Sequence, residues 1–135
     1  MARALYAPYR TLVLSAPPNL SSTNLKVVLT DHGADTPNVA TDDFLNDISA
    51  GTVATSGNLA NKTLGTVAAG VFDADNVTFT AVTGNSVESF TLYRDTGTAA
   101  TSDLLSYWDD ATGLPVTPNG GDITITFSAS GIFTF

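Results

Sequence analysis

The sequence predicts an all-β chain, folded as a single antiparallel β-sandwich or barrel-like domain with one short helix. Strong helix formers are scarce, because the 135 residues include one Glu, two Lys and one Met, whereas Thr and Val are abundant. Turn residues recur at close spacing, and the segments between them alternate apolar and polar side chains. This pattern is typical of antiparallel sheets, not of alternating strands and helices.

The clearest strands lie in the second half of the chain. Residues 76–83 alternate, with Val77, Phe79 and Ala81 on one face and threonines on the other, which predicts a strand with one buried face. Asn, Asp, Gly and Pro separate this strand from those that follow, as expected of turns. The further strands expected in this half are residues 87–94, 104–108, 122–127 and 131–135.

The first half is less regular, and we expect four strands and one helix in it. The helix candidate is residues 41–48, because Thr41 can cap its N-terminus and Phe44 and Ile48 would share one face. No linker or internal repeat divides the chain, so residues 25–135 are expected to form one sandwich domain. The strands expected in the first half are residues 11–15, 25–30, 53–55 and 59–64.

Residues 1–24 are expected to form either an extended arm that laces subunits together or an ordinary edge strand, since three prolines restrict the segment. Two tyrosines flank Pro8 in this segment. Tyrosine combines an apolar ring with a polar tip, which suits an anchor at a protein interface; local packing on the sheet edge is the alternative. The candidate interface residues are Tyr6, Pro8, Tyr9 and Arg10.

The charge balance argues against nucleic acid as a direct partner. Thirteen acidic residues against five Lys and Arg give a net charge of -8, and the basic residues are scattered, whereas phosphate binding requires clusters of them. Charged residues make up only 13% of the chain, against roughly a quarter in ordinary domains. Such a surface favours coverage by neighbouring subunits, and a soluble monomer with a Thr-rich exterior is the alternative. No stretch has the length of a membrane span, so we expect no membrane partner.

Groups for catalysis are few, and we expect no enzyme, no catalytic residue and no cofactor. The chain has no Cys, which excludes thiolate metal sites and cysteine nucleophiles. Its one histidine, His32, lies in a sequence typical of a polar turn. The glycine motifs that bind nucleotides and the motif of a serine nucleophile are missing.

Calcium is the remaining metal to consider. Asp73, Asp75 and Asn76 have the oxygen ligands that open a calcium loop, but the later Gly and Glu of an EF-hand are missing. Asp and Asn are also preferred in tight turns, where their side chains bind the local backbone. These three residues are therefore calcium candidates only, and no metal site is assigned.

Four stretches carry a resemblance to a known class of proteins, namely residues 41–45, 71–79, 93–102 and 112–123. In residue order and composition these stretches are similar to small virion proteins of tailed bacteriophages, which are often encoded close to the major capsid protein. The likeness contains no catalytic signature. It implies a structural component of the virion.

Among virion components, the resemblance implies a decoration or cement protein on the capsid exterior, made in the host cytoplasm. Such a protein clamps neighbouring shell subunits, so the expected partners are the major capsid protein and copies of this chain, as a trimer. Apolar burial and strand addition would supply the binding energy in place of charge. The alternatives are a head-tail connector or tail component, and a host-binding module on a fibre.

Overall fold

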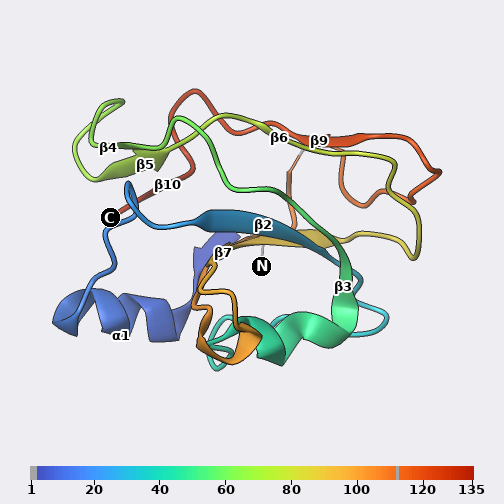
Figure 1. Ribbon diagram of the computed structural model, residues 1–135, viewed down its shortest axis with the longest axis horizontal. Helices are drawn as coiled ribbons and strands as arrows, with labels where there is room; N and C mark the ends of the chain where they lie inside the picture. Colours follow the sequence, from blue (N-terminus) through green and yellow to red (C-terminus); the bar gives the residue numbers. More distant parts are fainter. Residues whose placement is uncertain (1–2, 112) are drawn as a thin grey trace.

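A computed structural model describes residues 3–111 and 113–135 and consists mainly of strands in antiparallel sheets (Figure 1). The largest sheet has the strand order β1-β8-β7-β2-β3, and all its neighbouring strands are antiparallel. The prediction of a mainly β, antiparallel chain is confirmed. The five strands are Arg3–Leu5 (β1), Leu104–Trp108 (β8), Ser89–Arg94 (β7), Leu25–Thr30 (β2) and Thr52–Thr55 (β3).

Two smaller sheets, ordered β10-β5-β4 and β6-β9, lie over one face of the five-stranded sheet, and the helices lie on its other side (Figure 1). No sheet of the described residues closes into a barrel. The strands of the smaller sheets are Phe133–Thr134 (β10), Val71–Asp73 (β5), Thr63–Leu64 (β4), Val77–Phe79 (β6) and Ile123–Ile125 (β9). The helices are the α-helix Ala7–Ser15 (α1) and the 3-10 helices Leu45–Gly51 (η1) and Ala99–Thr101 (η2).

The central strands β7 and β8 are buried because other elements cover both faces of their sheet. On one face, Phe90 and Trp108 contact the ring of Phe127, which follows β9. On the other face, the hydroxyl of Tyr6 lies 2.9 Å from that of Thr91. A strand that is covered on both faces does not need to alternate apolar and polar residues, which explains why Thr91 is buried beside Phe90.

The prediction of a strand at residues 11–15 is wrong, since these residues form the second half of helix α1. Pro8 lies in the first turn of the helix, where an N–H group would have no partner and where its fixed φ suits helical backbone. Pro17 and Pro18 follow the helix and prevent it from continuing. Five residues were too few to distinguish the period of a strand from that of a helix.

The helix expected at residues 41–48 begins later and is a 3-10 helix. Phe44 has extended backbone and forms an isolated bridge with Asp103, so η1 starts only after it. The carboxylate of Asp47 accepts a hydrogen bond from the N–H group of Phe44 at 3.2 Å, which fixes this start. Thr41 is therefore not the N-cap of the helix.

Most of the remaining expected strands are present, and several are shorter than expected. The strand expected at 76–83 is limited to β6, because Ala81 is exposed and has a positive φ of 51°. The prediction that Ala81 shares the buried face of this strand is wrong. The strand expected at 59–64 is limited to β4, which begins after Asn61 with its positive φ of 52°.

The N-terminal segment packs against the same core as the rest of the chain. β1 is an edge strand of the five-stranded sheet, and α1 follows it directly. Tyr6 and Tyr9 belong to the hydrophobic core. A role of the segment in lacing subunits together stays a prediction. Residues 1, 2 and 112, which fall within the expected arm and one of the resembling stretches, lie outside the described residues.

Candidate interaction surface

The exposed large apolar side chains of the described residues gather at one end of the molecule, which we call the apolar end. In Figure 1 this end holds helix α1, the β4–β5 hairpin and strand β10. Single exposed apolar residues are common, but a group of them marks a surface that contacts another molecule. The apolar end consists of Leu14, Leu64, Val67 and Phe135, which are 88%, 50%, 44% and 59% exposed.

Helix α1 presents Leu14 to solvent because its opposite side is anchored in the core. Tyr9 is only 3% exposed, and Leu14, five residues later, is rotated from it by about 140° around the helix. The N–H group of Ala7 donates to the carbonyl of Val39 at 2.8 Å, which fixes the start of the helix. The sequence of α1 therefore produces one buried side and one side available for contact.

Phe135 is held by other aromatic rings, although more than half of its side chain is exposed. Its ring centroid lies 5.9 Å from that of Tyr9 and 5.7 Å from that of Phe133, the latter at an angle of 89°. Such edge-to-face contacts stabilise the position of a ring. The N–H group of Phe135 also donates to the carbonyl of Gly70 at 3.0 Å. The exposed ring is therefore ordered before any partner binds, which lowers the entropic cost of binding.

Two grooves flank Phe135. One has a volume of about 390 Å³ and lies between Phe135 and the side of α1 that carries Leu14. The other has a volume of about 240 Å³ and lies between Phe135 and Leu64 of the hairpin. Because the lining comes from three separate regions of the sequence, only the folded chain presents this surface.

The apolar end carries no acidic side chain, although the chain has a net charge of -8. Among the described residues that line its two grooves, none is Asp or Glu, and Arg10 is the one charged side chain. Arg10 has no acidic partner among the described residues and is available to a carboxylate of another molecule. The other basic side chains bind within the chain: Arg3 to Asp110, Lys26 to Asp95, Arg94 to Asp103, and Lys62 to the carbonyl of Thr23.

The four interface residues expected from the sequence lie at different depths. Tyr6 is fully buried, and burial raises the pKa of its phenol. Burial also raises the pKa of Tyr9 to about 12. Pro8 is half-buried, and Arg10 is exposed. Tyr9 therefore supports the ring of Phe135, Tyr6 contacts Thr91 of β7, and Arg10 lies on the surface of the apolar end.

The residues of the apolar end do not stand out in the sequence. Leu14 belongs to a segment with the pattern of a strand, and Phe135 alternates with Phe133 as a core residue would. A weak signal exists for Val67, because Gly65 and Gly70, both with positive φ, bound an uncharged loop around it. That loop could be recognised, but its exposure could not.

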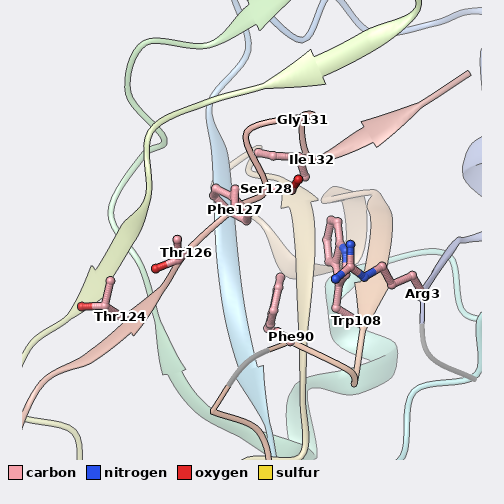
Figure 2. Close-up of a pocket in the computed structure, with 10 residues that line it drawn as sticks. Arg3, Phe90, Trp108, Thr124, Thr126, Phe127, Ser128, Gly131 and Ile132 are labelled. Carbon is pink, nitrogen blue, oxygen red and sulfur yellow. The ribbon is translucent and has the colours of Figure 1, made fainter. Parts of the chain in front are cut away.

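A second concavity, which we call the edge groove, runs along β1 between the five-stranded sheet and residues 124–133 (Figure 2). It has a larger section of about 560 Å³ and a smaller section of about 200 Å³. Both sections are lined by Arg3, Trp108 and Ile132, so they adjoin each other. The ring of Phe90 stacks on Trp108 at a centroid distance of 4.8 Å. The larger section falls in the size range of ligand-binding sites.

The single histidine lies in a polar cluster after β2. This residue is His32, and its Nε2 atom lies 2.8 Å from Oγ of Ser89 and 3.5 Å from the hydroxyl of Tyr107. A serine beside a histidine can begin a nucleophilic site, but Ser89 is fully buried. Glu88 accepts a hydrogen bond from the N–H group of His32 at 2.9 Å. These contacts hold the polar turn that the sequence predicts.

The calcium candidates make contacts within the chain. The amide of Asn61 donates to the carboxylate of Asp75 at 2.6 Å, and Oδ1 of Asn76 accepts a hydrogen bond from the N–H group of Phe127 at 2.9 Å. Asp73 ends strand β5. Among the residues that the structure describes, no group of three His, Cys, Asp or Glu could hold a metal ion. A calcium role for these residues stays a prediction.

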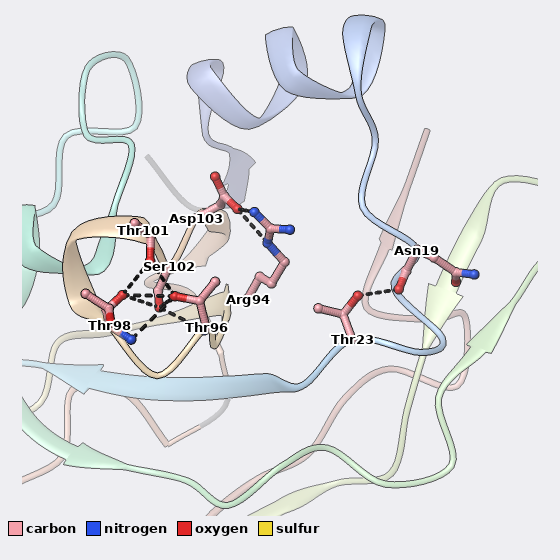
Figure 3. Close-up of polar contacts among 8 residues, drawn as sticks. All are labelled: Asn19, Thr23, Arg94, Thr96, Thr98, Thr101, Ser102 and Asp103. Atoms are coloured by element: carbon pink, nitrogen blue, oxygen red, sulfur yellow. Dashed lines mark hydrogen bonds and ion pairs between the residues drawn. The ribbon is translucent and has the colours of Figure 1, made fainter.

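The connection between β7 and β8 is built from hydroxyl groups and one ion pair (Figure 3). Nε of Arg94 donates to the carboxylate of Asp103 at 2.6 Å. The hydroxyl of Thr96 lies 2.6 Å from that of Thr101 and 3.1 Å from that of Ser102. Local side-chain bonds of this kind order turns, so we assign this cluster a structural role.

No protein-family model matches the chain, and a search of the curated proteins found no match. Residues 3–111 and 113–135 contain no helix long and apolar enough to cross a membrane.

Proposed function

We propose that this chain is a non-catalytic structural protein of a tailed bacteriophage virion, which decorates the capsid exterior by binding the major capsid protein and copies of itself. The apolar end carries the proposal, since it is an exposed apolar surface whose central ring is already ordered. The resemblance of the sequence to small virion proteins supplies the identity of the partner.

Apolar burial would supply most of the binding energy. Complete burial of a fully exposed side chain of this kind contributes about 1.5–3 kcal/mol, and Leu14, at 88% exposed, retains more of this gain than Phe135, at 59%. Arg10, at the edge of the same groove, would pair with a carboxylate of the shell and orient the contact. A few such contacts are sufficient when each copy bridges several subunits, because the second contact is then made within one complex.

The acidic remainder of the surface supports a position outside the shell. A net charge of -8 disfavours contact with packaged DNA. In this proposal the five-stranded sheet and the two smaller sheets form a β-sandwich, and the groove of the apolar end that is lined by Arg10, Leu14 and Phe135 faces the shell. Ser89, the serine beside His32, is fully buried, which supports a role without catalysis.

Phage heads that lack the protein test the proposal. We expect them to release DNA at a lower temperature than complete heads, and added purified protein to restore the higher temperature. The Leu14→Ser protein should restore it less well than the wild type. Ala100→Ser, a change at an exposed residue of η2, is the matched control and should restore it fully.

Two results would contradict a decoration role. Heads of unchanged thermal stability that fail to attach tails would identify a connector or tail component. Normal heads and tails with reduced adsorption to bacteria would identify a host-binding module on a fibre.

A further inference from the structure

The edge groove contains a buried polar atom that has no partner among the described residues. This atom is Oγ of Ser106, which lines the smaller section of the groove and is 2% exposed. A buried hydroxyl without a partner costs about 1–3 kcal/mol. A molecule that fills the groove and offers a polar group would remove this cost.

The register of β1 also leaves main-chain groups unpaired at the open edge of the sheet. The N–H group of Tyr6 donates to the carbonyl of Leu105 at 3.0 Å, and Leu5 lies opposite Ser106. Because hydrogen-bonded and non-hydrogen-bonded pairs alternate in an antiparallel ladder, the N–H and C=O groups of Leu5 and Arg3 point away from β8. The described sheet has no strand beyond β1. Such an edge binds further polypeptide backbone.

The charges of the groove favour an uncharged segment. Arg3 is the only charged residue among the described residues of its lining, and Nε of Arg3 donates to the carboxylate of Asp110 at 2.8 Å. The rings of Phe90, Trp108 and Phe127 line the larger section together with uncharged residues. A carboxylate placed against these rings would lose its hydration without gaining a partner. An apolar side chain would lose nothing.

The chain itself exposes a segment of this chemistry. Residues 65–70, which we call the hairpin loop, join β4 to β5, contain no charged side chain and are all exposed. Val67, in the middle of the loop, is 44% exposed. The N–H groups of residues 66–69 donate to no main-chain carbonyl of the described chain. The hairpin loop thus offers an apolar side chain that can contact the rings of the edge groove, and main-chain donors that can pair with the unpaired carbonyl groups of β1.

We propose that the hairpin loop of one copy binds the edge groove of the next copy, with Val67 beside Trp108 and the loop backbone paired with β1. The proposal rests on the proposed function, since it describes how copies contact one another on the shell. In the sheet order β10-β5-β4, strand β10, whose Phe133 lines the groove, separates the groove from the β4–β5 hairpin. The loop and the groove are therefore different surfaces of one chain. A contact between the loop of one copy and the groove of the next is head-to-tail and can close into a ring, such as a trimer.

Trp108 is the only tryptophan of the chain, so its fluorescence reports on the groove directly. On raising the concentration of the purified protein, we expect the Trp108 emission to shift in parallel with self-association measured by sedimentation equilibrium. Val67→Asp should weaken this association about tenfold or more, because it places a charge against the rings. Ala100→Asp, a matched change at an exposed residue outside the loop and the grooves, should leave it unchanged. Melting temperatures should show that both variants fold.

Cross-linking identifies the contact, because the chain has no cysteine of its own. Val67→Cys and Ser128→Cys proteins, the second altered in the groove lining, should form a mixed disulfide-linked dimer on oxidation. A mixture of Val67→Cys with Thr80→Cys, altered at an exposed residue outside the groove, should not.

Three results would overturn the inference. They are a monomer at all concentrations, a preference for dimers between two Val67→Cys chains, and cross-linking of Ser128→Cys to the major capsid protein in place of a second copy. A protein that stays monomeric and still restores the thermal stability of heads would leave the proposed function standing and remove only this inference.

Discussion

The centre of the five-stranded sheet and the apolar end are both rich in large apolar side chains, but they differ in what covers them. Phe90 lies between the sheets and is 2% exposed, whereas Phe135 is 59% exposed. Burial of Phe90 stabilises the chain itself. In the proposed function, burial of Phe135 is completed when another molecule binds. The same residue type would then contribute to folding in one region and to assembly in the other, and substitutions should separate the two contributions.

The largest effect on stability is expected in the centre of the sheet. Phe90→Ala removes a ring that contacts Trp108 and Phe127 and should lower the free energy of unfolding by about 3–5 kcal/mol. Urea denaturation followed by Trp108 fluorescence would measure it. A loss below about 1 kcal/mol would mean that the centre is packed loosely and that the contrast with the apolar end is wrong.

A smaller loss is expected beneath α1. Tyr6→Phe removes the hydroxyl that lies 2.9 Å from Oγ1 of Thr91 and leaves a buried hydroxyl without its partner. We expect a loss of about 1–3 kcal/mol in unfolding free energy. The double variant Tyr6→Phe, Thr91→Val should regain some of this loss. If the double variant is no more stable than the single one, the hydrogen bond does not contribute as described.

A weaker and pH-dependent effect is expected at Asp95. The ion pair with Lys26 at 2.8 Å and the N–H group of Gly97 lower the pKa of this carboxyl below its ordinary value of 3.8. The ionised Asp95 therefore stabilises the fold fully above pH 3.8, and this stabilisation is lost as the pH falls through the pKa of Asp95 in the folded state. Asp95→Asn should lower the unfolding free energy at pH 7 by about 0.2–1 kcal/mol.

The control for this effect is Lys26→Gln, which removes the larger of the two causes. The difference in unfolding free energy between the wild type and the Lys26→Gln protein should shrink as the pH is lowered from about 5 to about 2. A difference that stays constant over this range would show that the ion pair does not stabilise the fold.

The smallest effect on stability is expected at the apolar end itself. Leu14 is 88% exposed, so Leu14→Ser should change the unfolding free energy by no more than about 0.5 kcal/mol. The same substitution should weaken binding to phage heads severalfold in a co-sedimentation assay. A large loss of stability would show that Leu14 belongs to the core. Unchanged binding to phage heads would show that Leu14 does not belong to the interface.

Much of the sheet could be predicted from the sequence, because burial repeats along a strand with a period of two. β2 and β8 agree with the expected segments at both ends, since polar turn residues bound their apolar runs. Helix α1 could not be predicted, because the five apolar and polar residues of its second half fit a strand equally well. Its start depends on Ala7, which binds the distant carbonyl of Val39.

The candidate site was less predictable than the fold. Arg10 was expected at an interface and is exposed, but the tyrosines beside it are buried because they pack against strands that are distant in the sequence. Exposure of Leu14, Val67 and Phe135 depends on how three segments meet at one end of the molecule. No local sequence pattern predicts contacts between such distant segments, so only the tertiary structure shows which side chains stay exposed.

Electron cryo-microscopy of intact phage heads tests the central claim most directly, because it shows which face of the protein meets the shell. The account predicts density for the chain on the capsid exterior, with Leu14, Arg10 and Phe135 against the major capsid protein. Density with the apolar end directed to solvent, or no density on the head at all, would contradict it.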